Sequence, residues 1–408
     1  MNLPPGLEPL RYPHFRTLLA ARLAYNIGGY MFGLTVMWLV NELTHDPYYA
    51  GLVGLVEVIP VLILAFVAGH YTDKYDRRTI VLISRAAMLV TSVAFLLAPT
   101  KPSLYILYGL LMARAAARTF FSASQSNLVQ RTVPAELLPQ CVPLTSSIWY
   151  SGAIIGPVIA GAVIATTKTS TVAFGIEIAL ALVALGLYVT LPKQQPEPME
   201  QEDTWSSIRA GYDFLRANPI VFSAIALDLF AVLLGGAVIL LPRFNEVILR
   251  NSPTELGWLT AATPIGALIC SQFLTHRPPM KRAGMSMLLA VAGFGLATIG
   301  FGLSKTFWLA FLMICLTGAF DGVSVIIRST LLFTHVPDNM RGRVGAFNDV
   351  FVSSSNELGG FESGFLARWV GLVPAIVIGG IGTIASVLGV AALSPKFRDL
   401  GEMKAASE

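Results

Sequence analysis

The sequence is poor in charged residues, and this shortage is its first informative property. Asp, Glu, Lys and Arg make up 13% of the 408 residues, about half the share that a soluble protein uses to cover its surface. Hydrophobic residues make up 54%, and the mean hydropathy is +0.66. Most of the surface is therefore expected to face lipid, which argues against a soluble enzyme or a nucleic-acid-binding protein.

Cysteine and histidine are also scarce. The three cysteines, Cys141, Cys270 and Cys315, lie in apolar stretches, and the five histidines form no H-x-x-x-H cluster. Their spacing suits neither a metal site nor a disulfide framework. The sequence also has no Ser-His-Asp or Cys-His set and no phosphate-binding glycine loop. We therefore expect no metal, no cofactor and no enzymatic activity.

Long apolar runs dominate the rest of the chain. A bilayer core of about 30 Å needs roughly 20 apolar residues per helix, and twelve runs bounded by charge or proline meet this length. The predicted fold is all-α, with twelve transmembrane helices. The predicted spans are 15–41, 50–71, 79–99, 104–127, 141–166, 171–191, 220–248, 254–275, 284–303, 306–332, 344–369 and 371–393.

A polar stretch at 192–218 divides the twelve spans into two sets of six. The predicted organisation is a first six-helix bundle at 1–191, a cytoplasmic linker at 192–218, a second bundle at 219–395 and a cytoplasmic tail at 396–408. Lysine and arginine mark the cytoplasmic side of a membrane protein. They concentrate in the loops that share a side with both termini, and the other side holds only Lys101, Lys168, Arg250, Lys305 and Arg368.

The two sets of six spans resemble each other. At an offset of 203, Gly156 aligns with Gly359 and Gly161 with Gly364. Spans 1 and 7 align at an offset of 206, which matches Pro13 with Pro219 and Gly29 with Gly235. Repeated halves are typical of transporters that bind substrate at the interface between the repeats.

Two motifs carry a resemblance to a known family. Gly69–Arg78 resembles the loop 2–3 signature of the major facilitator superfamily, with Asp76 in place of its last glycine. Gly152–Gly161 in span 5 is similar to the antiporter motif of that superfamily, with Ala160 replacing one glycine. The segments 341–344 and 355–359 resemble the enterobactin-exporter-like branch of bacterial efflux proteins.

The resemblance implies roles for these motif residues. The loop residues that would latch the two halves in one state are Gly69, Asp73, Arg77 and Arg78. For Asp73 the alternative is a loop charge exposed to solvent. In span 5 the glycines would allow close helix packing and the proline a bend, with or without a role in preventing leaks. These residues are Gly152, Gly156, Pro157 and Gly161.

Ionisable residues within predicted spans are functional candidates, because burying a charge in a membrane is costly. Spans 1, 4, 7 and 10 line the central cavity of the superfamily. They hold Arg22, Arg114, Arg118, Asp228, Asp321 and Arg328. The repeat aligns Arg22 with Asp228 and Arg118 with Asp321. Two interpretations stay open, structural ion pairs and carboxylates that exchange protons. Asp228 and Asp321 rank first for proton exchange, with Arg22 and Arg118 as their partners or as anchors for an anionic substrate group.

Four further residues are weaker candidates. Glu57 in span 2 and Glu357 in span 11 are carboxylates at membrane depth that serve in proton coupling, in packing or in the latch. Tyr25 and Asn26 in span 1 either face the cavity or pack within the bundle.

The predicted function is secondary transport. The first hypothesis is a proton-coupled exporter of a small amphipathic molecule, such as a drug or siderophore, that works by alternating access in the bacterial inner membrane. The second is a flippase for lipids or lysolipids, or a transporter of a metal or metal chelate. The third is a receptor-like protein that has lost transport. The expected partners are a small-molecule substrate, protons and membrane lipids, and the chain is expected to act as a monomer.

Overall fold

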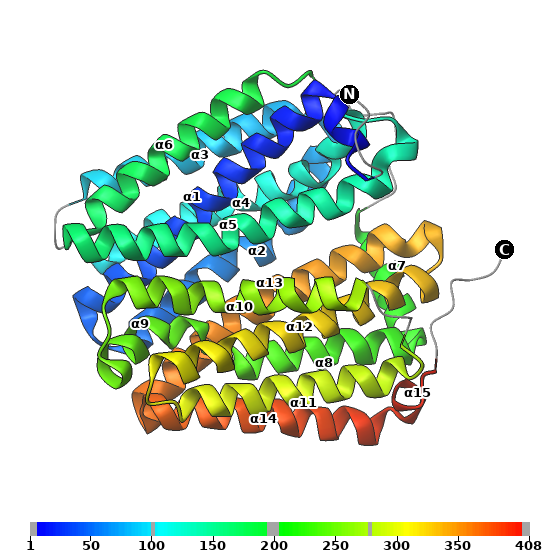
Figure 1. Cartoon of the computed structure of the whole chain (residues 1–408). Helices are drawn as coiled ribbons and strands as arrows, with labels where there is room; N and C mark the ends of the chain where they lie inside the picture. The colour runs from blue at the N-terminus through cyan, green and yellow to red at the C-terminus, as the bar shows by residue number, and fades with distance from the viewer. Residues whose placement is uncertain (1–5, 99–102, 194–203, 276–279, 402–408) are drawn as a thin grey trace. The chain divides into compact units, whose positions relative to one another are not determined.

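The computed structural model describes residues 6–98, 103–193, 204–275 and 280–401 (Figure 1). Helices account for almost all of these residues, and none of them lies in a β-strand. The long helices are α1 (Pro13–Thr44), α2 (Pro47–Lys74), α3 (Arg77–Leu97), α4 (Leu104–Gln125), α5 (Leu138–Thr167), α6 (Ser170–Val189), α8 (Pro219–Gly235), α10 (Pro253–Thr275), α11 (Ala283–Gly302), α12 (Phe307–His335), α13 (Asp338–Val370) and α14 (Leu372–Leu393). These elements confirm the predicted all-α membrane fold.

Eleven of the described segments are long and apolar enough to cross a membrane. The predicted span 344–369 is absent from these eleven, although α13 covers it with 33 residues. The charges and amides of α13 lower its hydropathy. Its small residues Gly359, Gly360 and Ser363 face the protein interior, as expected for a polar helix that is screened from lipid by its neighbours.

The seventh predicted span, 220–248, is not one continuous helix. Regular α-helix ends at Gly235 and is followed by a 3-10 turn at Ala237–Leu240, the short helix α9 (Leu241–Phe244) and a π-helical turn at Asn245–Leu249. Two consecutive glycines have a low helix propensity, and Pro242 removes a backbone donor. The sequence holds both signals, but the hydrophobicity of the run concealed them.

The predicted linker also contains structure. Residues Thr204–Ala217 form helix α7, which packs against α13. Leu215 is buried there with Val221, Val336 and Val344. The apolar residues of α7 recur at helical spacing, so the helix covers the end of α13 with one face and exposes charged residues on the other.

Contacts divide the chain into two compact units. Unit 1 comprises Met1–Leu43, Ile59–Glu200 and Ser252–Ala261, and unit 2 comprises Thr44–Val58, Gln201–Asn251 and Ala262–Glu408. The boundaries fall inside α2 and α10. The first turns of α2 therefore pack with unit 2, and the first turns of α10 pack with unit 1. The bundle boundaries predicted from the sequence, 1–191 and 219–395, stay a prediction.

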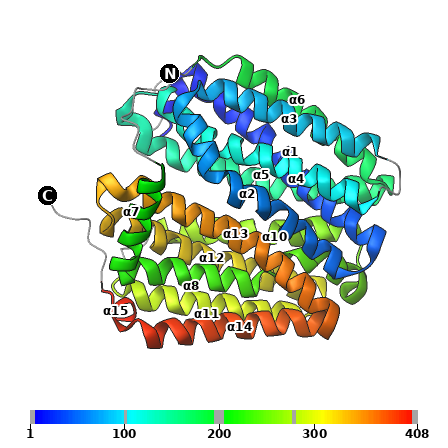
Figure 2. The ribbon, with the colours of Figure 1, turned by 180° about the vertical axis from the view of Figure 1, so that it is seen from behind.

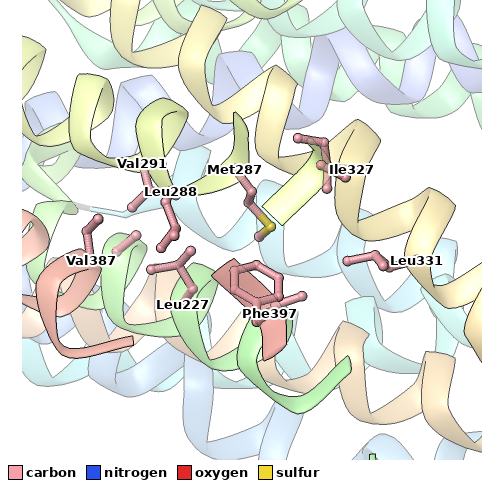
Figure 3. Close-up of a cluster of buried hydrophobic side chains, with 11 residues drawn as sticks. Leu227, Met287, Leu288, Val291, Ile327, Leu331, Val387 and Phe397 are labelled. Carbon is pink, nitrogen blue, oxygen red and sulfur yellow. The ribbon is translucent and has the colours of Figure 1, made fainter. Parts of the chain in front are cut away.

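Unit 2 has a well-packed apolar core that fixes the helices around its polar residues. In both views α11 and α14 run side by side (Figures 1 and 2). Figure 3 shows the side chains where α8, α11, α12 and α14 meet, with Leu227 and Met287 between Val387 on one side and Leu331 on the other. The short helix α15 (Pro395–Arg398) closes this cluster with Phe397, which is fully buried.

Candidate functional site

A cavity of about 160 Å³ lies inside unit 2. Residues of α8, α10, α11, α12 and α13, together with the 3-10 turn after α8, form its wall. Most of the wall is apolar, including Phe294, Phe301 and Val352. Its ionisable lining residues are Asp228, Asp321 and Arg328. A mostly apolar cavity with a few convergent polar groups is the usual form of a small-molecule site.

One stripe of α12 faces the cavity. Ile314, Thr317, Asp321, Val325 and Arg328 all line it, and they are separated by three or four residues. Residues at this spacing share one face of an α-helix. The helix therefore places Asp321 and Arg328 two turns apart on the same wall.

Asp228 and Arg328 form a buried ion pair. Their side chains are 5% and 7% exposed, and the Arg328 guanidinium contacts the Asp228 carboxylate directly. The Ser324 hydroxyl donates a second hydrogen bond to Asp228 at 3.3 Å. Leu227 and Ile327, the sequence neighbours of this pair, belong to the buried cluster of Figure 3.

Asp321 is in a different situation. It lines the same cavity but makes no hydrogen bond or ion pair with any residue that the structure describes, and it interacts with Asp228 and Arg328 only through their charges. Three ionisable groups therefore surround the cavity, and two of them neutralise each other. The remaining carboxylate needs a proton or a cation to become neutral.

The break after α8 opens onto this cavity. Gly235, Gly236, Ala237 and Val238 all line it. The last carbonyl groups of a helix lack intrahelical partners and carry partial negative charge. The C-terminus of α8 thus adds to the negative character of the cavity.

Unit 1 holds a second buried ion pair, between Arg114 on α4 and Glu177 on α6. The Arg114 Nη2 atom lies 3.0 Å from Glu177 Oε1. Arg114 also donates to Ser92 Oγ at 2.6 Å and to the Met88 carbonyl at 3.1 Å, and its guanidinium lies 3.6 Å from the ring centre of Phe32. Arg114, expected to line a substrate cavity, is thus enclosed within unit 1.

The other candidates in span 1 also have partners inside unit 1. Arg22 donates to the Gln125 carbonyl at 2.7 Å. Tyr25 packs against Phe121, and its ring lies 4.3 Å below the guanidinium of Arg85. Arg22 and Asp228 thus each have a partner inside their own unit, and the role of Arg22 as a partner of a carboxylate or as an anchor for an anionic group stays a prediction.

The repeat nevertheless relates these two contacts. At an offset of 206 Arg22 aligns with Asp228, and at an offset of 203 Gln125 aligns with Arg328. The structure shows an Arg22–Gln125 contact in unit 1 and an Asp228–Arg328 contact in unit 2. Equivalent positions thus meet in both halves, with different chemistry. Arg118, the counterpart of Asp321, is half-buried and lies within electrostatic reach of Tyr30.

Comparison with known proteins identifies the kind of molecule that holds this cavity. The sequence model of the transmembrane secretion effector family, a branch of the major facilitator superfamily, matches residues 5–407. The chain belongs to this family. It is a multi-pass membrane transporter, and the predicted family is confirmed.

Relatives and solved structures agree with this assignment. The enterobactin exporter EntS of Shigella boydii serotype 18 is 27% identical over 339 residues, which cover 82% of this chain and 80% of the exporter. EntS of Escherichia coli O1:K1 is 26% identical over the same shares. The nucleoside transporter NupG superposes with a TM-score of 0.69 at 16% identity, and the match covers 93% of this chain and 99% of NupG. A bacterial homologue of the lysosomal transporter Spinster, inward-facing and unoccupied, gives 0.66 at 16% identity, with 94% and 96% covered.

The glycines of the span 5 motif face two different helices in this transporter. A side chain at Gly156 would come within 2.6 Å of the Ile27 carbonyl on α1. Gly152 faces Asn26 of the same helix, so Asn26 lies at a helix crossing. Gly161 instead faces the first turns of α10, where the Cα atom of Gly257 would lie 3.0 Å from an added Cβ. Pro157 also takes part in this crossing, because its backbone carbonyl faces Gly257.

The loop 2–3 signature is only partly described. The side chain of Asp73 lies outside the described residues, and Gly69 has open space around its Cα atom. Arg78 donates a hydrogen bond to the Val189 carbonyl at the end of α6, a favourable place for a cation. Asp76, which departs from the family pattern, caps α3 by accepting a 2.9 Å hydrogen bond from the Thr79 amide.

Glu57 and Glu357 lie on two helices that cross in unit 2. Gly54, three residues before Glu57, packs against the backbone of Glu357, whose carbonyl carbon would lie 3.1 Å from an added Cβ. Asn356, the neighbour of Glu357, reaches the cavity. These contacts place the two glutamates near the α2–α13 crossing of unit 2.

Proposed function

We propose that this transporter is a proton-coupled exporter of a small amphipathic molecule, an antiporter that works by alternating access in the bacterial inner membrane with both termini in the cytoplasm. The observation that carries the proposal is the position of Asp321 in the cavity of unit 2, without a hydrogen bond or ion pair to any described residue.

The charges around the cavity support a proton-exchanging role for Asp321. Arg328 already neutralises Asp228, so an ionised Asp321 leaves one uncompensated negative charge in an apolar site. Such a charge is costly in a membrane protein. A carboxylate in this position takes up a proton when no cargo is present and releases it when the cavity opens to the other side or when cargo binds.

The direction of transport rests on two lines of support. The relatives from Shigella and Escherichia are enterobactin exporters, and the motif in span 5 resembles that of antiporters. Glycine contacts along this helix allow α5 to approach α1 and α10 closely, as expected for a helix that moves as part of a packed body.

The test uses purified protein in liposomes with an acidic interior, and ethidium and enterobactin as trial cargoes. We expect the natural protein to accumulate at least one of them and to release protons as it does so. Asp321→Asn should reduce proton-driven accumulation to the level of empty liposomes, because a neutral amide cannot exchange a proton.

Asp213→Asn is the matched control, because Asp213 lies on α7 with 63% of its side chain exposed, away from the cavity. It should transport at the natural rate. Full proton coupling in Asp321→Asn would remove Asp321 from the mechanism. Cargo flux that persists after the proton gradient is collapsed would favour a lipid flippase or a uniporter of metal chelates instead.

A further inference from the structure

We propose that the cavity of unit 2 binds the ring and the charged group of a small organic monocation, with Asp321 as its counter-ion. That this monocation is the transported substrate rests on the proposed transport function. The binding itself follows from the volume, wall and charge of the cavity.

The volume of the cavity sets the size of the group that it can hold. An apolar cavity of about 150 Å³ in a protein interior accepts one benzene molecule. This cavity, with its volume of about 160 Å³, therefore accommodates one aromatic ring or an aliphatic group of similar size. A larger cargo would place only one such group in this part of the protein.

The wall of the cavity suits an aromatic ring with a positive charge. Phe294 and Phe301 contribute aromatic surface, and the face of an aromatic ring attracts an ammonium group within about 6 Å. Thr298, Thr317 and Asn356 add neutral polar atoms to the lining. Neutral lining groups of this kind serve both charged and uncharged ligands, so they do not decide the sign.

The sign of the charge is decided by the ionisable groups. Asp228 and Asp321 contribute two negative charges and Arg328 one positive charge, so the ionised cavity carries a formal net charge of −1. Asp349 on α13 also acts on Arg328 through its charge, and it adds a further negative group outside the lining. The partial negative charge at the C-terminus of α8 acts in the same direction. An anion would meet repulsion, because the single guanidinium is already paired with Asp228.

The consequence is that proton and cation compete for one carboxylate. A monocation that enters the cavity displaces the proton of Asp321, and a proton that returns displaces the cation. No bond is made or broken beyond the O–H bond of the carboxyl group. Exchange of one charge for another would then need no second ion site.

The test compares three ligands that share one ring and differ in charge: phenethylammonium, phenethyl alcohol and phenylacetate. Binding to the full chain in nanodiscs is measured calorimetrically at pH 7.5, without any gradient. We expect phenethylammonium to bind about tenfold or more tightly than the alcohol, and phenylacetate not to bind. Affinity for the ammonium should fall as the pH is lowered, while affinity for the alcohol stays constant.

Two variants separate charge from shape. Asp321→Asn should lose about tenfold in ammonium affinity but keep the affinity for phenethyl alcohol, which shows that the variant still folds and forms the cavity. Gly235→Ala would bring a methyl group within 2.5 Å of Phe294. It should therefore lower the affinity for both phenethylammonium and phenethyl alcohol, because the methyl group crowds the cavity. Asp213→Asn should change neither.

Two results would overturn this inference: phenylacetate binding as tightly as phenethylammonium, or unchanged ammonium affinity in Asp321→Asn. Failure of proton coupling is a separate outcome, since these measurements use no gradient. Cation selectivity that survives in a protein without proton-driven transport would refute the antiport proposal and leave the cation site standing.

Discussion

At the scale of single residues, the two units hold their buried charges in different ways. In unit 1 Arg114 and Glu177 pair with each other, and Ser92 and the Met88 carbonyl accept two further hydrogen bonds from the arginine. In unit 2 the pair Asp228–Arg328 leaves Asp321 beside it without a hydrogen bond or ion pair to a described residue. The first arrangement pairs both buried charges, and the second leaves one carboxylate without such a partner.

The Arg114–Glu177 pair gives a prediction about stability. Removing one partner of a buried pair leaves the other charge uncompensated and costs about 3–5 kcal/mol. Glu177→Gln should therefore lower the free energy of unfolding by roughly this amount, measured by denaturant titration in detergent. The control is Glu246→Gln, because Glu246 pairs with Arg243 at 3.0 Å but is 43% exposed, and such pairs contribute at most about 1 kcal/mol. Equal losses in both variants would contradict this account.

At the scale of elements, two helix crossings repeat the same construction. In unit 1 Gly161 of α5 meets Pro253 and Gly257 of α10, and in unit 2 Gly364 of α13 meets Pro47 and Gly51 of α2. The offsets that align the halves, 203 and 206, also align these residues with each other. Glycine at both positions allows the backbones to approach closely, and such close packing contributes to helix association in lipid.

These crossings give a prediction about glycine substitutions. Gly161→Ala should lower the free energy of unfolding by about 1–3 kcal/mol, because the added methyl group overlaps the backbone of α10. Gly186→Ala in α6 is the matched control, since no atom lies within 4 Å of its would-be Cβ. It should be neutral or should stabilise α6 by up to about 1 kcal/mol through helix propensity. Similar melting temperatures for the two variants would show that the α5–α10 contact contributes little.

At the scale of the whole molecule, the distribution of lysine and arginine predicts the orientation in the membrane. In a variant with Cys141, Cys270 and Cys315 replaced by alanine, Lys396→Cys should react with an impermeant maleimide only after the cells are permeabilised. Lys305→Cys, in the connection between α11 and α12, should react in intact cells. Both positions are exposed, so access to the reagent depends on the side of the membrane. The opposite labelling pattern would invert the proposed topology.

The sequence was most informative where a property depends on local composition. The all-α membrane fold and the family were both readable, because the length and hydropathy of a run decide whether it crosses a bilayer and the motifs are local in sequence. The positions of Asp228 and Asp321 inside spans were readable for the same reason. The break after Gly235 was missed because the hydrophobicity of the run concealed its glycine and proline signals. Helix α7 was missed because its amphipathic pattern lies in a stretch that is polar as a whole.

The pairing of the buried charged residues was decided by the tertiary structure alone. The sequence aligned Arg22 with Asp228 and offered Arg22 as a partner or as an anchor for an anionic group. The structure shows that Asp228 pairs with Arg328 inside unit 2 and that Arg22 donates to the Gln125 carbonyl inside unit 1. Composition determines that a buried charge needs a partner, because an isolated charge in an apolar medium is costly. The partner itself depends on which helix faces are brought together, and only packing settles that. The same packing leaves Asp321 in the cavity without a hydrogen bond or ion pair to a described residue.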